Sequence, residues 1–293
     1  MPHQLQYNST PITELVLPRN KFELRLFIKR EDLNHPFVSG NKWWKLKYNL
    51  EEAVRLGHDT LLTFGGAYSN HIFATAAAGR ELRLKTIGII RGEETLPLNH
   101  TLAFAESCGM KLHYISREAY RKKTEAKFIH ELHSQFGNFY LIPQGGTNEL
   151  AVKGCQEWAQ QLNEIDFDYL CLPVGTGGTM AGLIEGLDPS KKIIGFSSLK
   201  GGEFLVDEIK KMISPEKYNW IINTDYHFGG YGKVTPELKG FVEKMRIQHQ
   251  LPVDVVYTGK MAFGILDLIS KNYFKSGSTI LLLHTGGMQI DYG

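Results

Sequence analysis

The chain has 293 residues, of which 42% are hydrophobic, and its 33 basic and 31 acidic residues give a net charge of +2. A chain of this length can bury one large or two medium cores. The interspersed charges argue against a surface for nucleic acid or an anionic membrane, so we expect a small-molecule partner. The polar amino terminus and short apolar runs predict neither a secretion signal nor a membrane span. We therefore expect a cytoplasmic protein.

The cysteines give no sign of a disulfide framework or a metal site. Cys108, Cys155 and Cys171 are odd in number and widely spaced along the chain. Disulfide frameworks and zinc sites use paired cysteines at short, regular spacings. We expect reduced thiols, mostly buried, and no bound metal.

The turn Ser39-Gly40-Asn41-Lys42 comes directly before an amphipathic run, 43–57, that predicts a helix. The positive end of a helix dipole disfavours a second positive charge, so the Lys42 amine is expected to lose its proton more easily than an ordinary lysine. A neutral amine is the form that attacks an aldehyde to give a Schiff base. On this feature alone, a solvated surface lysine remains the alternative.

From Thr60 onward, short β-rich runs alternate with helical patterns, which indicates βαβ units and a parallel sheet. The strands expected in the first series are 61–64, 86–90, 112–115 and 139–142. The helices expected between them are 71–82, 98–107 and 117–136. We predict that this block, 46–147, forms a small doubly wound domain.

A second series of strands and helices follows. Its expected strands are 169–174, 192–196, 218–222, 253–257 and 279–284, and its expected helices are 149–163, 179–187, 203–212 and 261–273. The first 45 residues contain a strand-like segment, 24–29, but no βαβ unit, so they should pack onto the second series. The sequence predicts an α/β protein in which 46–147 is inserted into a larger domain made of 1–45 and 148–293.

The strongest anion-binding signal is Gly175-Thr176-Gly177-Gly178-Thr179, which follows an apolar strand and begins a helix. Glycines let the backbone approach a ligand, and the N–H groups of the helix start favour an anion, with a phosphate ester as the natural guest. The loop lacks the third glycine of a dinucleotide fingerprint and the Gly-Lys-Ser/Thr ending of a P-loop. A purely structural strand-to-helix turn remains the alternative.

A second strand-to-helix junction has side chains suited to a carboxylate or a phenolate. It contains Gly65 and Gly66, followed by Ser69, Asn70 and His71. Ser69 is expected to cap the helix, as many serines do at this position. Asn70 and His71 fall in the first turn, where free N–H groups favour an anion.

A third group is expected at the carboxyl ends of two late strands, where open α/β sheets bind ligands. It consists of the segments 257–260, beginning with Tyr257, and 284–287. Tyr231 lies in a glycine-rich loop, Gly229 to Gly232, that is similar in kind. An aromatic at the edge of the core and a mobile surface turn are the respective alternatives.

Together these motifs resemble the fold type II pyridoxal-phosphate enzymes, the tryptophan synthase β-like group, and within it the 1-aminocyclopropane-1-carboxylate deaminase and D-cysteine desulfhydrase family. The resemblance covers nearly the whole chain in the family's order. The segments that carry it are 28–33, 39–42, 65–66, 69–71, 175–179, 257–260 and 284–287. It implies a two-domain, three-layer parallel-sheet fold, a pyridoxal 5′-phosphate cofactor, a small amino-acid substrate and a homodimer.

The resemblance also implies a role for each residue. Lys42 would hold the cofactor as a Schiff base and then act as the base at the substrate Cα. Asn70 would bind the cofactor's 3′-oxygen. The implied phosphate ligands are Gly175, Thr176, Gly177, Gly178 and Thr179. The substrate carboxylate would be received by Ser69, which also counts among the catalytic residues, with Asn70 and His71, and Tyr257 and Tyr231 would flank the substrate as acid/base or positioning groups.

Two positions separate the activities within this family. Deaminases are expected to carry Glu after the catalytic Tyr and Leu before the late Gly-Gly, whereas desulfhydrases carry hydroxyl residues, as Thr258 and Thr285 do here. A carboxylate beside the pyridine nitrogen would strengthen electron withdrawal for ring opening, while a hydroxyl suffices for β-elimination. We therefore predict a D-cysteine desulfhydrase.

Two alternatives accompany this prediction. The first is a 1-aminocyclopropane-1-carboxylate deaminase. The second, more distant, is a non-catalytic nucleotide-binding α/β module with Lys42 on its surface. The chain is also shorter than expected for the family between Gly186 and Tyr231, a region expected to contribute helices around the substrate mouth. The native substrate and its stereochemistry stay open at this point.

Overall fold

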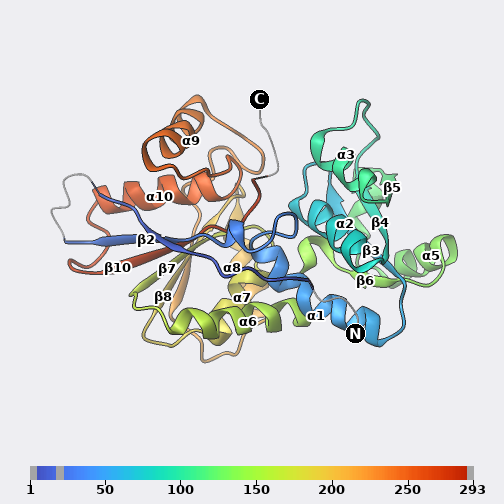
Figure 1. The fold of residues 1–293 in the computed structure, drawn as a ribbon, viewed down its shortest axis with the longest axis horizontal. Helices are drawn as coiled ribbons and strands as arrows, with labels where there is room; N and C mark the ends of the chain where they lie inside the picture. The colour runs from blue at the N-terminus through green and yellow to red at the C-terminus, as the bar shows by residue number, and fades with distance from the viewer. Residues whose placement is uncertain (1–4, 18–22, 289–293) are drawn as a thin grey trace.

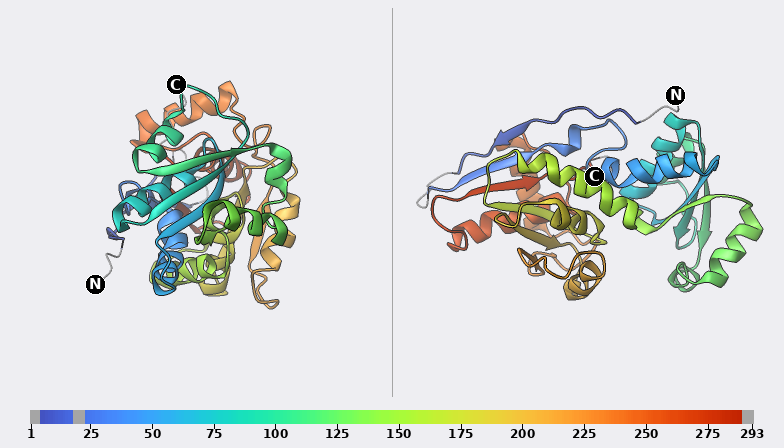
Figure 2. Two further views of the ribbon diagram at one scale, coloured as in Figure 1. Left: turned by 90° about the vertical axis from the view of Figure 1, so that its right-hand side faces the viewer. Right: turned by 90° about the horizontal axis from the view of Figure 1, so that it is seen from below.

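The structure is a computed structural model that describes residues 5–17 and 23–288. In this part of the chain the strands form two sheets, six-stranded with the order β1-β2-β10-β7-β8-β9 and four-stranded with the order β5-β4-β3-β6. Figures 1 and 2 show the two sheets in separate lobes. The strands are β1 (Ile12–Glu14), β2 (Arg25–Lys29), β3 (Thr60–Gly66), β4 (Lys85–Arg91), β5 (Met110–Ile115), β6 (Tyr140–Ile142), β7 (Tyr169–Val174), β8 (Lys192–Ser197), β9 (Trp220–Asn223) and β10 (Thr279–Leu283).

The helices cover the faces of both sheets. The α-helices are α1 (Asn41–Arg55), α2 (Asn70–Leu82), α3 (His100–Ser107), α4 (Arg117–Arg121), α5 (Ala126–Phe136), α6 (Glu149–Asn163), α7 (Gly178–Gly186), α8 (Leu205–Lys210), α9 (Pro236–His249) and α10 (Thr258–Ser270). Short 3-10 turns occur at η1 (Glu31–Leu33), η2 (Gln144–Gly146) and η3 (Gly202–Phe204). No helix among the described residues is long and apolar enough to cross a bilayer.

The larger sheet is buried on both faces, which gives this lobe three layers. Successive side chains of a strand point to opposite faces. Leu281 and Leu283 of β10 accordingly join the cluster that contains buried residues of α1, α6 and α7. Ile280 and Leu282 join the cluster that contains buried residues of α10. The paired strands of this sheet are parallel except β1 and β2, which pair antiparallel.

The smaller sheet is parallel throughout and is also covered on both sides. Leu62 and Phe64 of β3 pack with Tyr120 of α4 and Leu132 of α5. On the other side α2 is rich in buried alanine, and short side chains let a helix lie close to a sheet. Because α2 follows β3 and β4 runs parallel to β3, the carboxyl ends of both strands lie at the edge of the lobe where α2 begins.

The chain starts in the larger sheet, forms the smaller one and then returns to the larger one. This order supports the inserted domain of 46–147 within 1–45 and 148–293, which we retain as a proposal. The proposed boundary at 45/46 falls inside α1. The first half of this helix packs on α6, because the rings of Trp44 and Trp158 are stacked with their centroids 5.8 Å apart.

Most predicted elements occur within a few residues of their expected positions, but the strand expected at 253–257 is wrong. Those residues form a turn that leads into α10. The Asp254 carboxylate accepts hydrogen bonds from the N–H groups of Val256, Tyr257 and Thr258 at 2.6–2.9 Å. A side chain that satisfies consecutive backbone donors favours a helix start over a strand.

Other differences are smaller. The single helix expected at 117–136 is two helices, α4 and α5, separated by a turn in which Glu125 N–H donates to the Lys122 carbonyl at 2.8 Å. The helix expected at 203–212 is η3 followed by α8. The sequence analysis missed the short strand β1 and the helix α9. In α9 only Leu238 and Met245 are buried, so its sequence has little apolar periodicity.

Candidate active site

Lys42 lies in the first turn of α1, and the position of that turn is fixed by Gly40. Gly40 has φ +66° and ψ −142°, a conformation that is essentially restricted to glycine. A Cβ at this position would collide with the carbonyl of Thr285. That carbonyl also accepts a hydrogen bond from the Asn41 N–H at 3.3 Å. The turn before Lys42 is therefore seated directly on the loop after β10.

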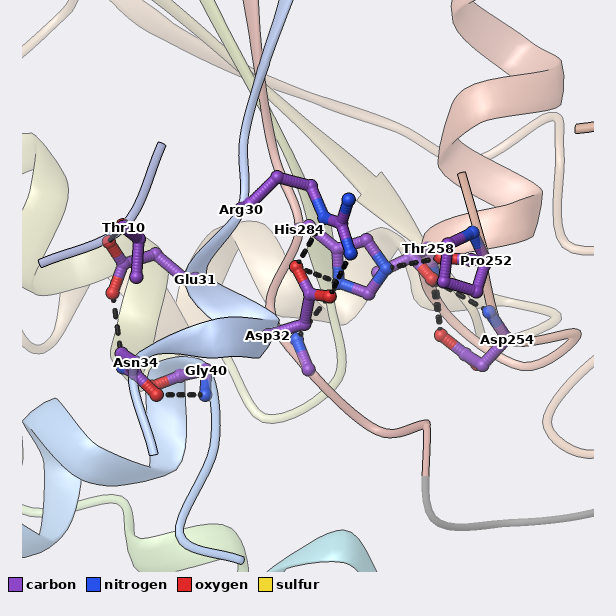
Figure 3. Close-up of polar contacts among 11 residues, drawn as sticks. Thr10, Arg30, Glu31, Asp32, Asn34, Gly40, Pro252, Asp254, Thr258 and His284 are labelled. Carbon is purple, nitrogen blue, oxygen red and sulfur yellow. Dashed lines mark hydrogen bonds and ion pairs between the residues drawn. The ribbon is translucent and has the colours of Figure 1, made fainter. Parts of the chain in front are cut away.

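The buried carboxylate of Glu31 holds this turn from the other side (Figure 3). It accepts hydrogen bonds from Thr10 Oγ1 at 2.7 Å, Asn34 Nδ2 at 3.1 Å and Trp44 Nε1 at 3.1 Å. Asn34 in turn receives the Gly40 N–H at 2.9 Å and donates to the Gly40 carbonyl at 3.0 Å. A buried carboxylate with several donors is stable and rigid. The segment 28–33 thus positions the lysine turn.

A second set of contacts begins at the neighbouring Asp32 (Figure 3). Arg30 pairs with Asp32 at 2.7 Å, and Asp32 lies 3.5 Å from Nδ1 of the fully buried His284. The other ring nitrogen of His284 donates to the Pro252 carbonyl at 2.7 Å. His284 therefore joins the end of β10 to the turn that begins α10.

The Lys42 amine is prepared to react as a free base. Its Nζ donates to Asn41 Oδ1 at 2.8 Å. Burial lowers the pKa of Lys42 to about 8, and the negative charge of Asp254 partly opposes this shift. Near neutral pH a usable fraction of the amine is consequently neutral, as Schiff-base chemistry requires. Burial, and not the helix dipole expected from the sequence, is the main cause of this shift.

Polar side chains gather around the glycine-threonine loop. Asn41 Nδ2 donates to Thr179 Oγ1 at 2.8 Å, and the hydroxyls of Thr147 and Thr176 lie 2.6 Å apart. Lys45 Nζ donates to Thr147 Oγ1 at 2.8 Å. Burial and, after it, the charge of Lys42 lower the pKa of Lys45 to about 7. The negative charge of a bound anion would offset the cost of burying this amine in its protonated form.

Lys45 is a site residue that was not predicted from the sequence, although a signal was present. Lys45 follows Lys42 by three residues, so the two side chains share one face of α1. A lysine that is 2% exposed on this face needs an explanation beyond solvation.

The backbone of this loop is closely packed and has no space for side chains at its glycines. Gly177 has φ +82°, and a Cβ on Gly178 would lie 2.7 Å from Cγ2 of Thr147. Side chains are thus excluded where α7 begins, and the first N–H groups of a helix have no partner within it. Threonine hydroxyls, helix N–H groups and a buried amine suit a phosphate group. The nearby Lys42 suits an aldehyde on the same molecule.

The second junction begins α2 as the sequence predicts. Ser69 is the N-cap residue, and its hydroxyl accepts the Ile72 N–H at 3.3 Å. A Cβ on Gly287 would lie 2.6 Å from Nδ2 of Asn70. The amide of Asn70 therefore lies against the loop after β10, and this contact joins the two lobes at the site.

The ring of His71 is hydrogen-bonded within the small lobe and has no N–H left to donate to a substrate carboxylate. Thr63 Oγ1 donates to the Ile142 carbonyl at 2.8 Å, so it accepts from His71 Nε2, also at 2.8 Å. Nδ1 is then a bare acceptor, and it has no hydrogen-bond partner within the described residues. A bare acceptor cannot donate to a carboxylate. Any carboxylate contact of His71 would use its backbone N–H.

Tyr257 and Tyr231 lie together beside the glycine-threonine loop. A Cβ on Gly175 would lie 3.2 Å from Cε1 of Tyr257. The rings of Tyr257 and Tyr231 meet edge-on with their centroids 5.9 Å apart, and their side chains share a hydrogen bond. Two residues expected to flank the substrate are therefore neighbours.

Thr258 and Thr285 are both buried, at 0% and 8% exposure. The hydroxyl of Thr258 donates to Asp254 Oδ2 at 2.5 Å and accepts the Asp254 N–H at 3.0 Å. Asp254 was not predicted as a site residue, because 253–257 was expected to be a strand. An Asp three or four residues before a Thr-Gly helix start is the signal that could have found it.

Comparison with known proteins agrees with this geometry. Residues 3–286 match the pyridoxal-phosphate dependent enzyme family. The chain is 32% identical to a Thermotoga maritima protein provisionally named as a 1-aminocyclopropane-1-carboxylate deaminase, covering 97% of this chain and 95% of that protein. It is also 32% identical to the bifunctional D-cysteine desulfhydrase/1-aminocyclopropane-1-carboxylate deaminase of Arabidopsis thaliana, with 97% and 77% coverage.

A solved structure described as an ACC deaminase homologue superposes with a TM-score of 0.81 at 29% identity. The superposition covers 98% of this chain and 91% of that one. The two-sheet α/β architecture is therefore similar to that of this neighbour over nearly its whole length.

Proposed function

The chain belongs to the pyridoxal-phosphate dependent enzyme family, and we propose that it eliminates thiol from D-cysteine to give pyruvate, ammonia and hydrogen sulfide. Its relatives identify it more broadly as a pyridoxal-phosphate dependent lyase of the 1-aminocyclopropane-1-carboxylate deaminase and D-cysteine desulfhydrase group. The proposal concerns the substrate and the roles of the individual residues.

The residues present fit the cofactor. When bound, pyridoxal phosphate supplies the electron-withdrawing ring that makes the bonds at the substrate Cα labile. In our proposal Lys42 would form the covalent link to the cofactor, and Lys45 would balance the charge of its phosphate. The residues that would hold the phosphate are Gly175, Thr176, Gly177, Gly178 and Thr179. Asn70 would bind the cofactor's 3′-oxygen.

The remaining residues act on the substrate. The N–H groups at the start of α2, with Ser69, hold its carboxylate. Lys42 would accept the Cα proton at Nζ. The electron pair left at Cα would form a Cα=Cβ double bond as the Cβ–S bond breaks, the thiolate would leave with the electron pair of the Cβ–S bond, and the Tyr257–Tyr231 pair would deliver a proton to it. Water releases ammonia from the three-carbon product, which leaves pyruvate.

The observation that carries the choice of elimination is the hydroxyl of Thr258. It occupies the position after Tyr257, and its proton is donated to Asp254 at 2.5 Å. Unlike a Glu at this position, a hydroxyl adds no second negative charge beside Asp254, and it would therefore stabilise a protonated ring nitrogen less strongly. Elimination tolerates this because a good leaving group departs early. The second candidate, opening of the cyclopropane acid, is favoured only by the names of relatives.

The experiment is a product assay on the cofactor-loaded protein with D-cysteine, L-cysteine and 1-aminocyclopropane-1-carboxylate. We expect equimolar pyruvate and sulfide from D-cysteine and little 2-oxobutanoate from the cyclopropane acid. Lys42→Ala is the inactive control, and Lys244→Ala on the exposed face of α9 should behave as the wild type. Deamination of the cyclopropane acid without activity on D-cysteine would establish the second candidate instead.

We further propose that the enzyme is a homodimer, which rests on the family resemblance, and that it is cytoplasmic, which rests on the default expectation from its sequence. Light scattering behind a sizing column measures the molar mass directly, and a value near the 33.2 kDa of one chain would contradict the dimer.

A further inference from the structure

Lys260 is a buried lysine that the proposed reaction does not use. It lies one turn after Tyr257 in α10 and is 1% exposed. Its Nζ donates to the carbonyls of His227 at 2.9 Å and Gly230 at 2.8 Å. Both carbonyls belong to the loop directly before Tyr231, so the ammonium binds the backbone next to a residue expected to flank the substrate.

The loop before Tyr231 belongs to no helix or strand, and its backbone has an unusual conformation. Gly229, Gly230 and Gly232 have φ values of +91°, +117° and +67°, and Phe228 has φ +52°. Non-glycine residues adopt positive φ at a cost, so Phe228 must be held by its surroundings. The loop's own hydrogen bonds include Gly230 N–H to the His227 carbonyl at 3.0 Å.

One face of α10 supplies the holding contacts. Residues 260, 263 and 267 share this face because they follow one another at spacings of three and four. The ring of Phe263 meets Phe228 edge-on at 5.0 Å, and Asp267 accepts from Tyr226 Oη at 2.6 Å. Lys260 adds the polar contact nearest to Tyr231.

We infer that Lys260 is a positioning residue that ties the Tyr231 loop to α10, and so fixes Tyr231 against Tyr257. Two hydrogen bonds from one ammonium to two carbonyls three residues apart set the course of the loop between them. Burial lowers the pKa of Lys260 to about 8, against the opposing charge of Asp254. A buried cation is costly, and its carbonyl partners here both lie in this loop. The inference rests on the proposed function for the role of Tyr231, but not for the contact itself.

Hydrogen exchange tests the contact without any assay of activity. In the cofactor-loaded protein, Lys260→Met should raise the exchange of amides 228–233 about tenfold or more relative to wild type, as expected when a local opening becomes easier. Peptides from α6 should be unchanged. Lys244→Met, the same substitution at an exposed site on α9, is the matched control. Equal exchange in Lys260→Met and wild type would overturn the inference.

A kinetic cycle tests the route through Tyr231. Lys260→Met should lower kcat about 10- to 100-fold, the size of effect that small misplacements produce, with a much smaller change in KM. In the Tyr231→Phe background the same substitution should cost less than about twofold, because the group that it positions is already lost. Equal losses in both backgrounds would overturn the positioning role.

Hydrogen exchange also tests the contact if Lys260→Met does not fold or if the wild-type protein is inactive. If Lys260→Met does not fold, slow exchange of amides 228–233 in the wild-type protein supports the hold, and exchange as fast as in an unstructured peptide contradicts it. If the wild-type protein shows no elimination on any amino acid, the proposed function fails, while the exchange result still decides the contact.

Discussion

Asn41 donates a hydrogen bond from Nδ2 to Oγ1 of Thr179 at 2.8 Å, which connects the residue before Lys42 to the first turn of α7. The two ends of the proposed cofactor site are thereby held at a fixed separation. Thr179→Val removes this acceptor and one phosphate donor. We expect cofactor affinity to fall by about one to two decades, the loss of a hydrogen bond to a charged group. Titration of the apoprotein with pyridoxal phosphate measures this affinity.

The chain offers a matched control for this prediction. Thr101 in α3 is buried, and its hydroxyl has no hydrogen-bond partner among the described residues. Thr101→Val removes the same atoms away from the site, so cofactor affinity should not change. Wild-type affinity in Thr179→Val would move the phosphate site elsewhere.

The lowered pKa of Lys42 predicts how cofactor uptake depends on pH. Only the neutral amine attacks the aldehyde, and this form increases as pH rises through about 8. The second-order rate of appearance of visible absorbance should therefore rise between pH 6.5 and 8.5 and then level off. Lys42→Ala should show no such absorbance. A rate that keeps rising toward the pKa of an ordinary lysine, about 10.4, would contradict the effect of burial.

Borohydride reduction followed by peptide mapping identifies the reactive lysine. The pyridoxyl group should appear on Lys42. Lys45 is the informative competitor, because it lies on the same helix face and its pKa is lowered to about 7. Labelling of Lys45 in the wild-type protein would reverse the roles that we give to these two residues.

Gly40→Ala should impair both stability and cofactor uptake. The substitution forces an L-residue into a glycine-only conformation and drives its Cβ into the Thr285 carbonyl. Gly57→Ala is the control, because Gly57 also has positive φ, at +75°, but a Cβ there meets nothing within 4 Å. Chemical denaturation should show a cost of about 1 kcal/mol for Gly57→Ala, from conformation alone, and a clearly larger one for Gly40→Ala. Equal costs would show that the turn shifts freely.

His71 makes stability depend on pH. Burial, followed by the charges of Lys42 and Lys45, holds the pKa of His71 well below its usual range. The unfolded chain therefore binds a proton near pH 6.5 that the folded chain does not. This contribution to the free energy of unfolding is complete above about pH 6.5 and is lost as pH falls below it, with a slope of up to about 1.4 kcal/mol per pH unit.

Denaturation at several pH values between 5 and 8 measures that slope. His71→Gln should flatten it, whereas the same substitution at His130, which is exposed in α5, should leave it as in wild type. An identical slope in His71→Gln would assign the titration to another group.

The sequence was sufficient for the alternating core of the fold but not for its polar contacts. Strands such as β7, with six consecutive buried residues, show their burial as an apolar run. By contrast, α9 exposes most of its surface and gives no such pattern. The apolar side chains of the segment before α10 predict a strand, while the decisive feature is the Asp254 carboxylate, which accepts consecutive backbone N–H groups of this turn.

The site shows the same limit. Lys42 and the glycine-threonine loop are recognisable from their order along the chain. The partner of His71 is Thr63, in a different element, and Lys260 is explained only by carbonyls about thirty residues away. Contacts between distant segments depend on the folded arrangement, which one sequence does not reveal.

The last prediction concerns Thr258 and its neighbour Asp254. Thr258→Glu imitates the residue expected in a deaminase, but the hydroxyl that it replaces lies 2.5 Å from Asp254 Oδ2 in a fully buried position. Two carboxylates so close cannot both ionise, and the pKa of one would rise strongly. We expect a less stable protein whose elimination is depressed at least about tenfold and which gains no more than trace ring opening.

Thr258→Ser keeps the hydroxyl and should retain most of the activity. The double change Thr258→Glu with Asp254→Asn removes the repulsion, so its stability should exceed that of Thr258→Glu alone despite the second substitution. This non-additivity is the signature of two groups in contact. Denaturation of the four proteins in the cycle, with pyruvate and 2-oxobutanoate assays in parallel, measures both effects. If Thr258→Glu alone were as stable as wild type and deaminated the cyclopropane acid readily, Asp254 would not constrain this position and the preference for elimination would rest on Thr258 by itself.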